Sequence, residues 1–246
     1  AAGRGPGPGP AGGPGGAPAA RGPGSMDVIN RLLSMGVDPN HELTQKRPYG
    51  TGGGRFQEYD RRGGTGPLMV AAMNNDHAAI EVLLKHGAEV DLRNVFMMTP
   101  LMVAAGMSGT GNDGAPGPSG ERVFKTIDLL VEGGADVDAR VEGSTRRTAT
   151  LVSYVIGRKD QEGRTALLAA AGRGNDAMVR YLLQVGADPT LRDAAGKSAL
   201  DLAQEPPPDS ITNEQQRARL IAGRKASAEL LQAALAAGGG QRTTAN

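Results

Sequence analysis

One short phrase recurs four times in this chain and constrains its fold more than any other feature. The phrase is clearest at 99–105, Thr-Pro-Leu-Met-Val-Ala-Ala, and it returns at 66–72, 165–171 and 198–203. Its second residues stand at positions 67, 100, 166 and 199, so the first and last steps are equal and the middle step is twice as long. A recurring period of this size indicates stacked supersecondary units rather than one globular core.

A second phrase fixes the phase of these units. It reads Leu83-Leu84-Lys85-His86-Gly87-Ala88, and its glycine recurs at positions 36, 134 and 186. The distance from the first phrase to this glycine is the same from 67 to 87 as from 166 to 186, but it is longer from 100 to 134. The step onward from 134 to 166 is also longer than the equal steps from 87 to 100 and from 186 to 199. The doubled middle step therefore contains two insertions and no hidden unit.

Each phrase has a physical interpretation. Thr is a good helix N-cap and Pro fits the first turn, so Thr99-Pro100 predicts the start of a helix. The run 80–84 is apolar at helical spacing and ends shortly before Gly87, the residue type favoured just beyond a helix end. Each unit is therefore predicted to contain a first helix, a tight turn, a second helix and an extended excursion to the next unit.

These phrases resemble the ankyrin repeat, and the resemblance covers roughly residues 25–237. The matching segments are Thr-Pro-Leu at 99–101, Gly-Ala-Asp-Val at 134–137, and the Gly-Arg-Thr and Gly-Lys-Ser triplets at 163–165 and 196–198. The histidine of the family's Thr-Pro-Leu-His phrase is replaced here by Met69, Met102, Leu168 and Asp201. The resemblance implies an all-α solenoid, a stack of helix-turn-helix units with β-hairpin-like connecting fingers. The long insertions further resemble a bacterial subset of ankyrin proteins.

The phase of the two phrases predicts the layout of the whole chain. A Gly/Pro/Ala-rich tract at 1–24 is expected to be disordered, and 238–246 is expected to be a flexible tail. Between them we expect a half unit and four full units at 25–40, 64–94, 95–140 (with an insertion at 108–121), 162–193 and 194–237 (with an insertion at 205–222). Two further inserted loops are expected at 41–63 and 141–161. A final helix at 226–236 would cap the stack.

The tract at 1–24 has two interpretations. It is either a plain flexible tail or the insertion within a unit whose first helix lies upstream of Ala1. The second interpretation follows from the run 26–35, which looks like a second helix without a first. A similar tract at 114–120 separates the two helices of the third unit.

The two long loops carry unusual chemistry. Residues 41–63 and 138–160 each have a net charge of +2, in a chain whose net charge is +1. They also contain four of the seven aromatic residues, Tyr49, Phe56, Tyr59 and Tyr154. The β-prone run 148–156 predicts one arm of a β-hairpin. The loops either bind a partner or have aromatic residues that pin them to the stack while their charges are solvated.

The resemblance to ankyrin repeats implies a second candidate surface, because in that family the hairpin tips and the ends of the first helices line a concave, partner-binding face. We expect Phe96 and Met98 to form an apolar patch there, flanked by Arg and Lys. Alternatively, the methionines fill the gap left where Met97 replaces a hairpin glycine. With Tyr154 from the loop, the candidate partner-binding residues are Met73, Asn74, Arg93, Val95, Phe96, Met98, Met107, Tyr154, Arg173, Arg192 and Lys197.

Signals for catalysis are weak. The three histidines, at positions 41, 77 and 86, are not spaced as helical ligand pairs, and the Gly-Lys-Ser triplet at 196–198 lacks the earlier glycine of a phosphate-binding loop. The chain has no cysteine and only 3% aromatic residues. We therefore expect no enzyme activity, cofactor or metal, and neither nucleic acid binding nor membrane insertion. The favoured function is a monomeric protein-interaction module. The alternatives are an ankyrin segment of a larger protein, enzymatic or not, and a structural spacer.

Overall fold

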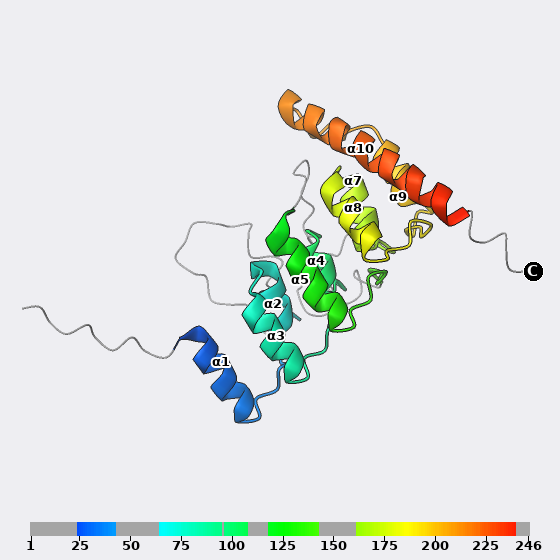
Figure 1. Ribbon diagram of the computed structural model, residues 1–246. Helices are drawn as coiled ribbons and strands as arrows, with labels where there is room; N and C mark the ends of the chain where they lie inside the picture. The colour runs from blue at the N-terminus through cyan, green and yellow to red at the C-terminus, as the bar shows by residue number, and fades with distance from the viewer. Residues whose placement is uncertain (1–23, 43–63, 95, 108–117, 143–160, 240–246) are drawn as a thin grey trace, which may run out of the picture.

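The computed structural model describes residues 24–42, 64–94, 96–107, 118–142 and 161–239. In the described part of the chain, four helix pairs follow a single first helix. The pairs lie side by side in a row (Figure 1). In each pair we call the first helix inner and the second outer. The inner helices are α2 (Pro67–Asn74), α4 (Pro100–Ala104), α7 (Ala166–Gly172) and α9 (Ala199–Gln204). The outer helices are α1 (Ser25–Ser34), α3 (His77–Lys85), α5 (Glu121–Glu132), α8 (Asp176–Gln184) and α10 (Glu214–Gly239). The predicted all-α solenoid is confirmed.

The inner helices begin where the recurring phrase predicts. The side-chain oxygens of Thr99, Thr165 and Ser198 each accept the backbone N–H three residues on, which satisfies one of the donors that a helix start leaves free. Proline occupies the first turn at Pro67 and Pro100, where no N–H is needed. The phrase is therefore a helix-start signal as well as a repeat marker.

The hairpin tip that precedes each inner helix needs a left-handed residue. Gly64, Gly163 and Gly196 have φ of 64°, 74° and 77° at equivalent places, three residues before the first residue of the inner helix. Met97 has the same place and a φ of 60°. The prediction that Met97 replaces a hairpin glycine is confirmed. A side chain in this conformation costs about 1 kcal/mol, which the surrounding contacts must offset.

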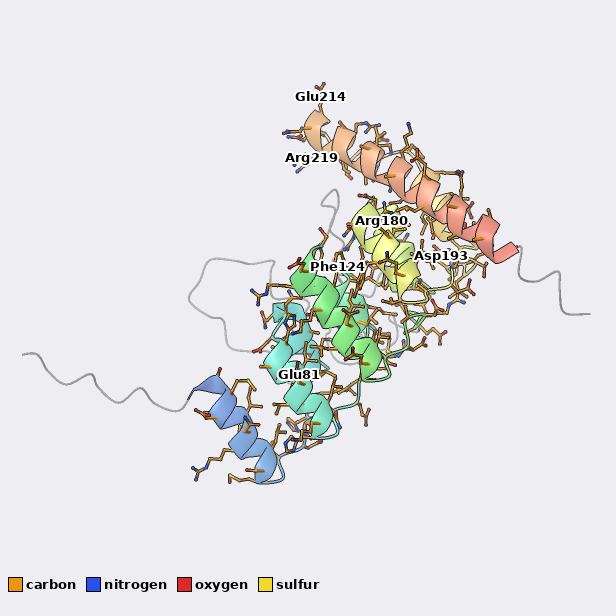
Figure 2. All side chains as sticks on the ribbon, viewed as in Figure 1. Glu81, Phe124, Arg180, Asp193, Glu214 and Arg219 are labelled. Atoms are coloured by element: carbon orange, nitrogen blue, oxygen red, sulfur yellow. The ribbon has the colours of Figure 1, made fainter. Side chains whose placement is uncertain are left out.

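Small side chains let the inner helices approach one another. A continuous core runs through the stack, from α2 and α3 to α9 and α10, and α7 contributes an almost wholly apolar face of alanine and leucine. Consecutive inner helices contact each other, α2 with α4 and α7 with α9. The outer helices turn charged side chains such as Glu81 and Arg180 to solvent (Figure 2). This layout is a one-dimensional array in which each unit is stabilised mainly by its neighbours.

The last helix is longer than predicted. The sequence places it at 226–236, after an expected insertion at 205–222, but α10 already starts at Glu214. Leu220 and Arg224 are buried, and Gly223 packs so closely on Gly174 that a Cβ there would lie 2.0 Å from the Gly174 carbonyl oxygen. This contact with a distant turn gives the early part of the helix a partner that the local pattern cannot reveal.

The second long inserted segment leaves the stack through a closed neck. The Val141 N–H donates to the Arg164 carbonyl at 3.0 Å, and the Gly163 N–H donates to the Val141 carbonyl at 2.6 Å. The predicted β-hairpin arm at 148–156 and most of the two long loops lie outside the described residues. Within the described ranges the only β-bridge is an isolated antiparallel one between Arg192 and Ser198. None of the described helices is long and apolar enough to cross a membrane.

Candidate interaction surface

Side-chain caps hold the hairpin tips rigid. Asn94 Oδ1 accepts the backbone N–H groups of Phe96 (3.0 Å) and Met98 (3.1 Å). Asp193, labelled in Figure 2, makes the same arrangement in the last tip and accepts the Lys197 N–H at 3.0 Å. The backbone of a tip held in this way does not have to be ordered by a partner, which lowers the entropy cost of binding.

An arginine ladder joins successive tips. Arg93, Arg140 and Arg192 each lie six residues after the glycine that ends an outer helix. The Arg93 guanidinium donates to the Arg140 carbonyl, and that of Arg140 donates to the Arg192 carbonyl. Arg140 Nε also donates to the Gly163 carbonyl at 3.3 Å. The guanidinium of Arg192, at the end of the ladder, pairs with Asp201 at 3.0 Å.

A second set of hydrogen bonds, which we call the turn ladder, also joins successive units. Its residues lie two positions before the position of the arginine ladder in each unit. Side-chain oxygens of Asn40, Asp91 and Asp138 accept backbone N–H groups of the next unit at 2.7 to 3.0 Å, those of Glu89, Asp136 and Asp188. Burial raises the pKa of the Asp91 and Asp138 carboxyls, while the accepted N–H group opposes that shift.

Asn40 fits its place in the turn ladder better than Asp91 does. The Asn40 amide uses both ends, because its Nδ2 donates to the Gly87 carbonyl at 3.2 Å. At Asp91 the second oxygen, Oδ1, is buried and has no hydrogen-bond partner. A carboxylate cannot donate to a carbonyl, so the aspartate leaves this buried oxygen uncompensated.

The expected apolar patch at Phe96 and Met98 is not on the surface. Phe96 is 3% exposed, Met98 0% and Met107 3%. They form a second core cluster with residues of the inner helices, such as Met102, and with Val141 at the start of the second long loop. The prediction of an exposed patch was wrong, because these side chains are buried in this cluster. The alternative, in which the methionines fill a gap, describes the observed packing.

Most of the other candidate residues also have structural partners. Met73 is half-buried against the second cluster, and Arg173 donates to the Gly106 carbonyl. Arg93 belongs to the arginine ladder. Val95 and Tyr154 lie outside the described residues.

Three of the predicted residues reach solvent. Asn74, at the end of α2, is exposed and donates to the Val70 carbonyl at 2.8 Å. The side chains of Arg192 and Lys197 are 60% and 49% exposed, and Lys197 pairs with Glu205. Arg192 and Lys197 flank the last tip. We call Arg192 and Lys197 the tip surface; Asn74 lies apart from them, at the end of α2.

The described part of the chain offers little for catalysis. It contains no group of three or more His, Asp, Glu or Cys side chains placed to hold a metal ion. His77 lies on the outer side, where its Nε2 is 2.9 Å from the Arg122 carbonyl oxygen. What the described surface can supply is ordered hydrogen-bond donors and positive charge.

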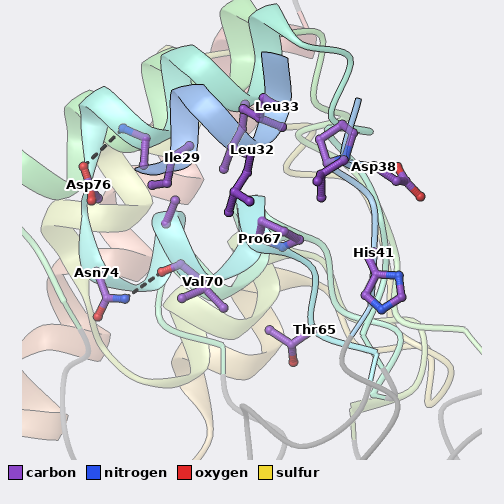
Figure 3. A pocket seen from close by; sticks show the side chains of 15 residues that line it. Ile29, Leu32, Leu33, Asp38, His41, Thr65, Pro67, Val70, Asn74 and Asp76 are labelled. Atoms are coloured by element: carbon purple, nitrogen blue, oxygen red, sulfur yellow. Dashed lines mark hydrogen bonds between the residues drawn. The ribbon is translucent and has the colours of Figure 1, made fainter. Parts of the chain in front are cut away.

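Sequence reasoning missed a groove at the N-terminal end of the stack. It has a volume of about 380 Å³ and lies between α1, α2 and α3 (Figure 3). Its lining is mainly aliphatic, with Ile29, Leu32 and Leu33 from α1 opposite Pro67 and Val70 from α2. The signal was available, since the run 26–35 was recognised as an outer helix without an inner one.

Comparison with protein families agrees with the repeat phase. Residues 18–141 match the family model for ankyrin repeats in three copies, and residues 156–203 match the model for ankyrin repeats in many copies. The first match alone covers half of the chain.

Similar proteins come from animals. The transient receptor potential cation channel subfamily A member 1 homolog of Caenorhabditis elegans is 29% identical over 142 residues, which is 58% of this chain and 9% of the channel homolog. Ankyrin repeat family A protein 2 of Homo sapiens and of Mus musculus is 51% identical over 49 residues, 20% of this chain and 16% of the relative. This chain thus matches only a small part of either relative. These relatives give no support to the expected bacterial resemblance.

Proposed function

This chain belongs to the ankyrin repeat family, and we propose that it is a non-catalytic protein-interaction module that binds through the tip surface of its concave face. Ankyrin repeats are protein-interaction modules, so we expect the partner to be a protein. The assignment of partner binding to the tip surface is our proposal.

One observation carries this proposal: the tips are ordered by their own side chains while Arg192 and Lys197 remain open to solvent. The arginine and turn ladders fix the position of each tip relative to the next. Arginine is enriched in binding hot spots, and a partner that meets a rigid surface does not have to order it first. Arg192 and Lys197 already pair with Asp201 and Glu205, so they offer a partner oriented hydrogen-bond donors in a locally balanced set of charges.

The experiment is capture of a partner followed by reconstitution. The chain is used as bait, the captured protein is purified, and its Kd is measured for the unchanged chain and for the double variant Arg192→Glu, Lys197→Glu. We expect affinity to fall at least tenfold, or roughly 1.4 kcal/mol. Arg219→Glu is the control, since Arg219 is exposed on α10, away from the tips. An unchanged Kd in the folded double variant would refute the assignment to the tip surface.

The relatives support a second candidate, an ankyrin segment that regulates or targets a larger protein. The matched regions make up 9% and 16% of those relatives. Mass spectrometry of the endogenous polypeptide tests this candidate. A mass equal to that of the 246 residues would contradict it, and a larger mass with an adjoining domain would support it.

A further inference from the structure

The exposed apolar residues of the described chain are concentrated at one end. The large hydrophobic side chains that remain exposed are those of Val28, Leu32, Met35, Val37 and Ile221. Four of these five belong to α1 or to the turn after it. None of the residues of α1 is buried, although it is amphipathic and packs on α3. An exposed apolar face of this kind indicates an interaction site.

The inner helices show what such a face normally meets. Four residues of α2 line the groove, Pro67, Val70, Ala71 and Asn74. The inner helix α4 packs on α2. In α4 and the turn after it, the four equivalent positions are all buried: Pro100, Val103, Ala104 and Met107. Of the four α2 residues only Ala71 is buried, while Val70 is half-buried and Asn74 is exposed. The same positions are therefore covered in α4, which packs on α2, and open in α2.

The groove thus has the shape and chemistry of a site for an inner helix. One wall of the groove is an outer helix, α1, and the other wall is an inner helix, α2. The inner helix α4 likewise packs between an outer helix, α5, and an inner helix, α2. The floor is made by Ala79 and Leu83 of α3. A helix with aliphatic and small residues at spacings of three and four would bury its apolar stripe against these surfaces.

The segment before α1 does not have this chemistry. Residues 1–23 consist only of Ala, Gly, Pro and Arg, with no Leu, Ile, Val, Met or Phe. Frequent glycine and proline oppose helix formation, and the segment has no large aliphatic side chain to fill the groove. Residues 1–23 therefore do not supply the helix that fits.

We propose that the groove between α1 and α2 is a docking site for one short apolar helix of a partner protein, built like the inner helices of this chain. This site is separate from the tip surface and does not depend on it. Docking places the partner helix in the row of inner helices and covers Leu32 and Val70. It extends an interface that the chain already uses between its own units.

The probe is a fluorescein-labelled peptide with the sequence of residues 65–76, which contains α2, titrated with the full chain and followed by anisotropy. We expect saturation with a Kd below about 1 mM, because a helix this short is marginal alone and must be ordered on binding. Leu32→Asp in the chain should weaken binding by roughly tenfold or more. Ile221→Asp, at an exposed apolar site on α10, is the matched control and should leave Kd unchanged.

A second peptide, with proline in place of Ala71, keeps the test independent of how the chain variants fold. Proline in a helix interior costs about 3 kcal/mol, so this peptide should not bind. Absence of saturation with the first peptide, equal binding by the two peptides, or no effect of Leu32→Asp would each overturn the proposal.

Two other occupants give distinct results that would also overturn it. A second copy of the chain in the groove would appear as a concentration-dependent dimer that Leu32→Asp dissociates. A helix of the same polypeptide would appear as loss of peptide binding in a longer natural form of the chain. The double variant of the tip surface, Arg192→Glu with Lys197→Glu, changes no residue of the groove and should bind the peptide normally, so failure of this site and failure of the proposed function are distinguishable.

Discussion

The two ends of the stack differ in how their last helix is held. At the C-terminal end, α10 contacts α7, α8 and α9 and buries Leu220 and Leu231. At the N-terminal end, α1 packs on α3 alone among the larger contacts, and none of its residues is buried. An isolated helix as short as α1 is marginal in water, so what stabilises such a helix is its tertiary contacts. The comparison teaches that a terminal outer helix needs an inner helix beside it.

The largest contrast is expected from one leucine at each end. Leu231→Ala removes a fully buried side chain from the core and should lower the free energy of unfolding by about 3 kcal/mol. Leu32→Ala, at a side chain that is 44% exposed, should change it by less than about 0.5 kcal/mol. Urea unfolding followed by circular dichroism measures both. Equal losses would show that α1 is as firmly integrated as α10.

Hydrogen bonds of Arg224 also hold α10 at the C-terminal end of the stack. Its guanidinium donates to the Gly172 carbonyl at 2.6 and 2.8 Å and to the Glu205 carbonyl at 2.7 Å. Arg224→Met would leave these carbonyls without their donors and should cost about 2 kcal/mol in the same experiment. Arg219→Met, on the exposed side of α10, should have an effect within about 0.5 kcal/mol. Similar values for the two variants would mean that α10 is held by apolar contacts alone.

The turn ladder offers a smaller effect of opposite sign. Asp91→Asn keeps the acceptor for the Asp136 N–H, removes a partly buried charge and adds a donor like that of Asn40. We expect a gain of about 1 kcal/mol at pH 7. Asp138→Asn is the matched variant and should gain less, because only Asp91 has a buried oxygen without a partner among these two.

This gain should depend on pH with a definite sign. Burial raises the pKa of Asp91 in the folded chain above its ordinary value of 3.8, so the folded state takes up the proton first as pH falls. The destabilisation by the charged carboxylate is therefore complete above the folded-state pKa and is gone below 3.8. The advantage of Asp91→Asn from charge removal should shrink over that window. A gain that grows as pH falls would contradict this account.

The smallest effect on the free energy of global unfolding is expected at Asn40, the first residue of the turn ladder. Asn40→Ala removes the bonds to the Glu89 N–H and the Gly87 carbonyl, which tie the turn after α1 to the next unit. We expect faster hydrogen exchange of the α1 amides and a change of only a few tenths of a kcal/mol in global unfolding. Asn30→Ala, at an exposed site within α1, should not speed exchange. Unchanged exchange in Asn40→Ala would mean that contact with α3 alone retains α1.

Local signals in the sequence predicted the frame of the molecule but not its surface. Helix starts at Thr99 and Thr165, and the glycine-like role of Met97, depend on residues within a few positions, and these predictions were confirmed. The exposure of Phe96 was mispredicted because this side chain is buried in a cluster that includes residues distant in the sequence, such as Val141. The bonds of Arg140 were missed because their acceptors are backbone carbonyls, which leave no mark in a sequence.

The neck at Val141 and Gly163 has a consequence for how this chain can change over time. Because the two ends of the inserted segment are joined to each other by backbone hydrogen bonds, its length is decoupled from the register of the helices on either side. The entropy of closing a flexible loop grows only with the logarithm of its length, so doubling the segment costs about 0.6 kcal/mol. This position can therefore accept additional or substituted sequence while units three and four keep their contact.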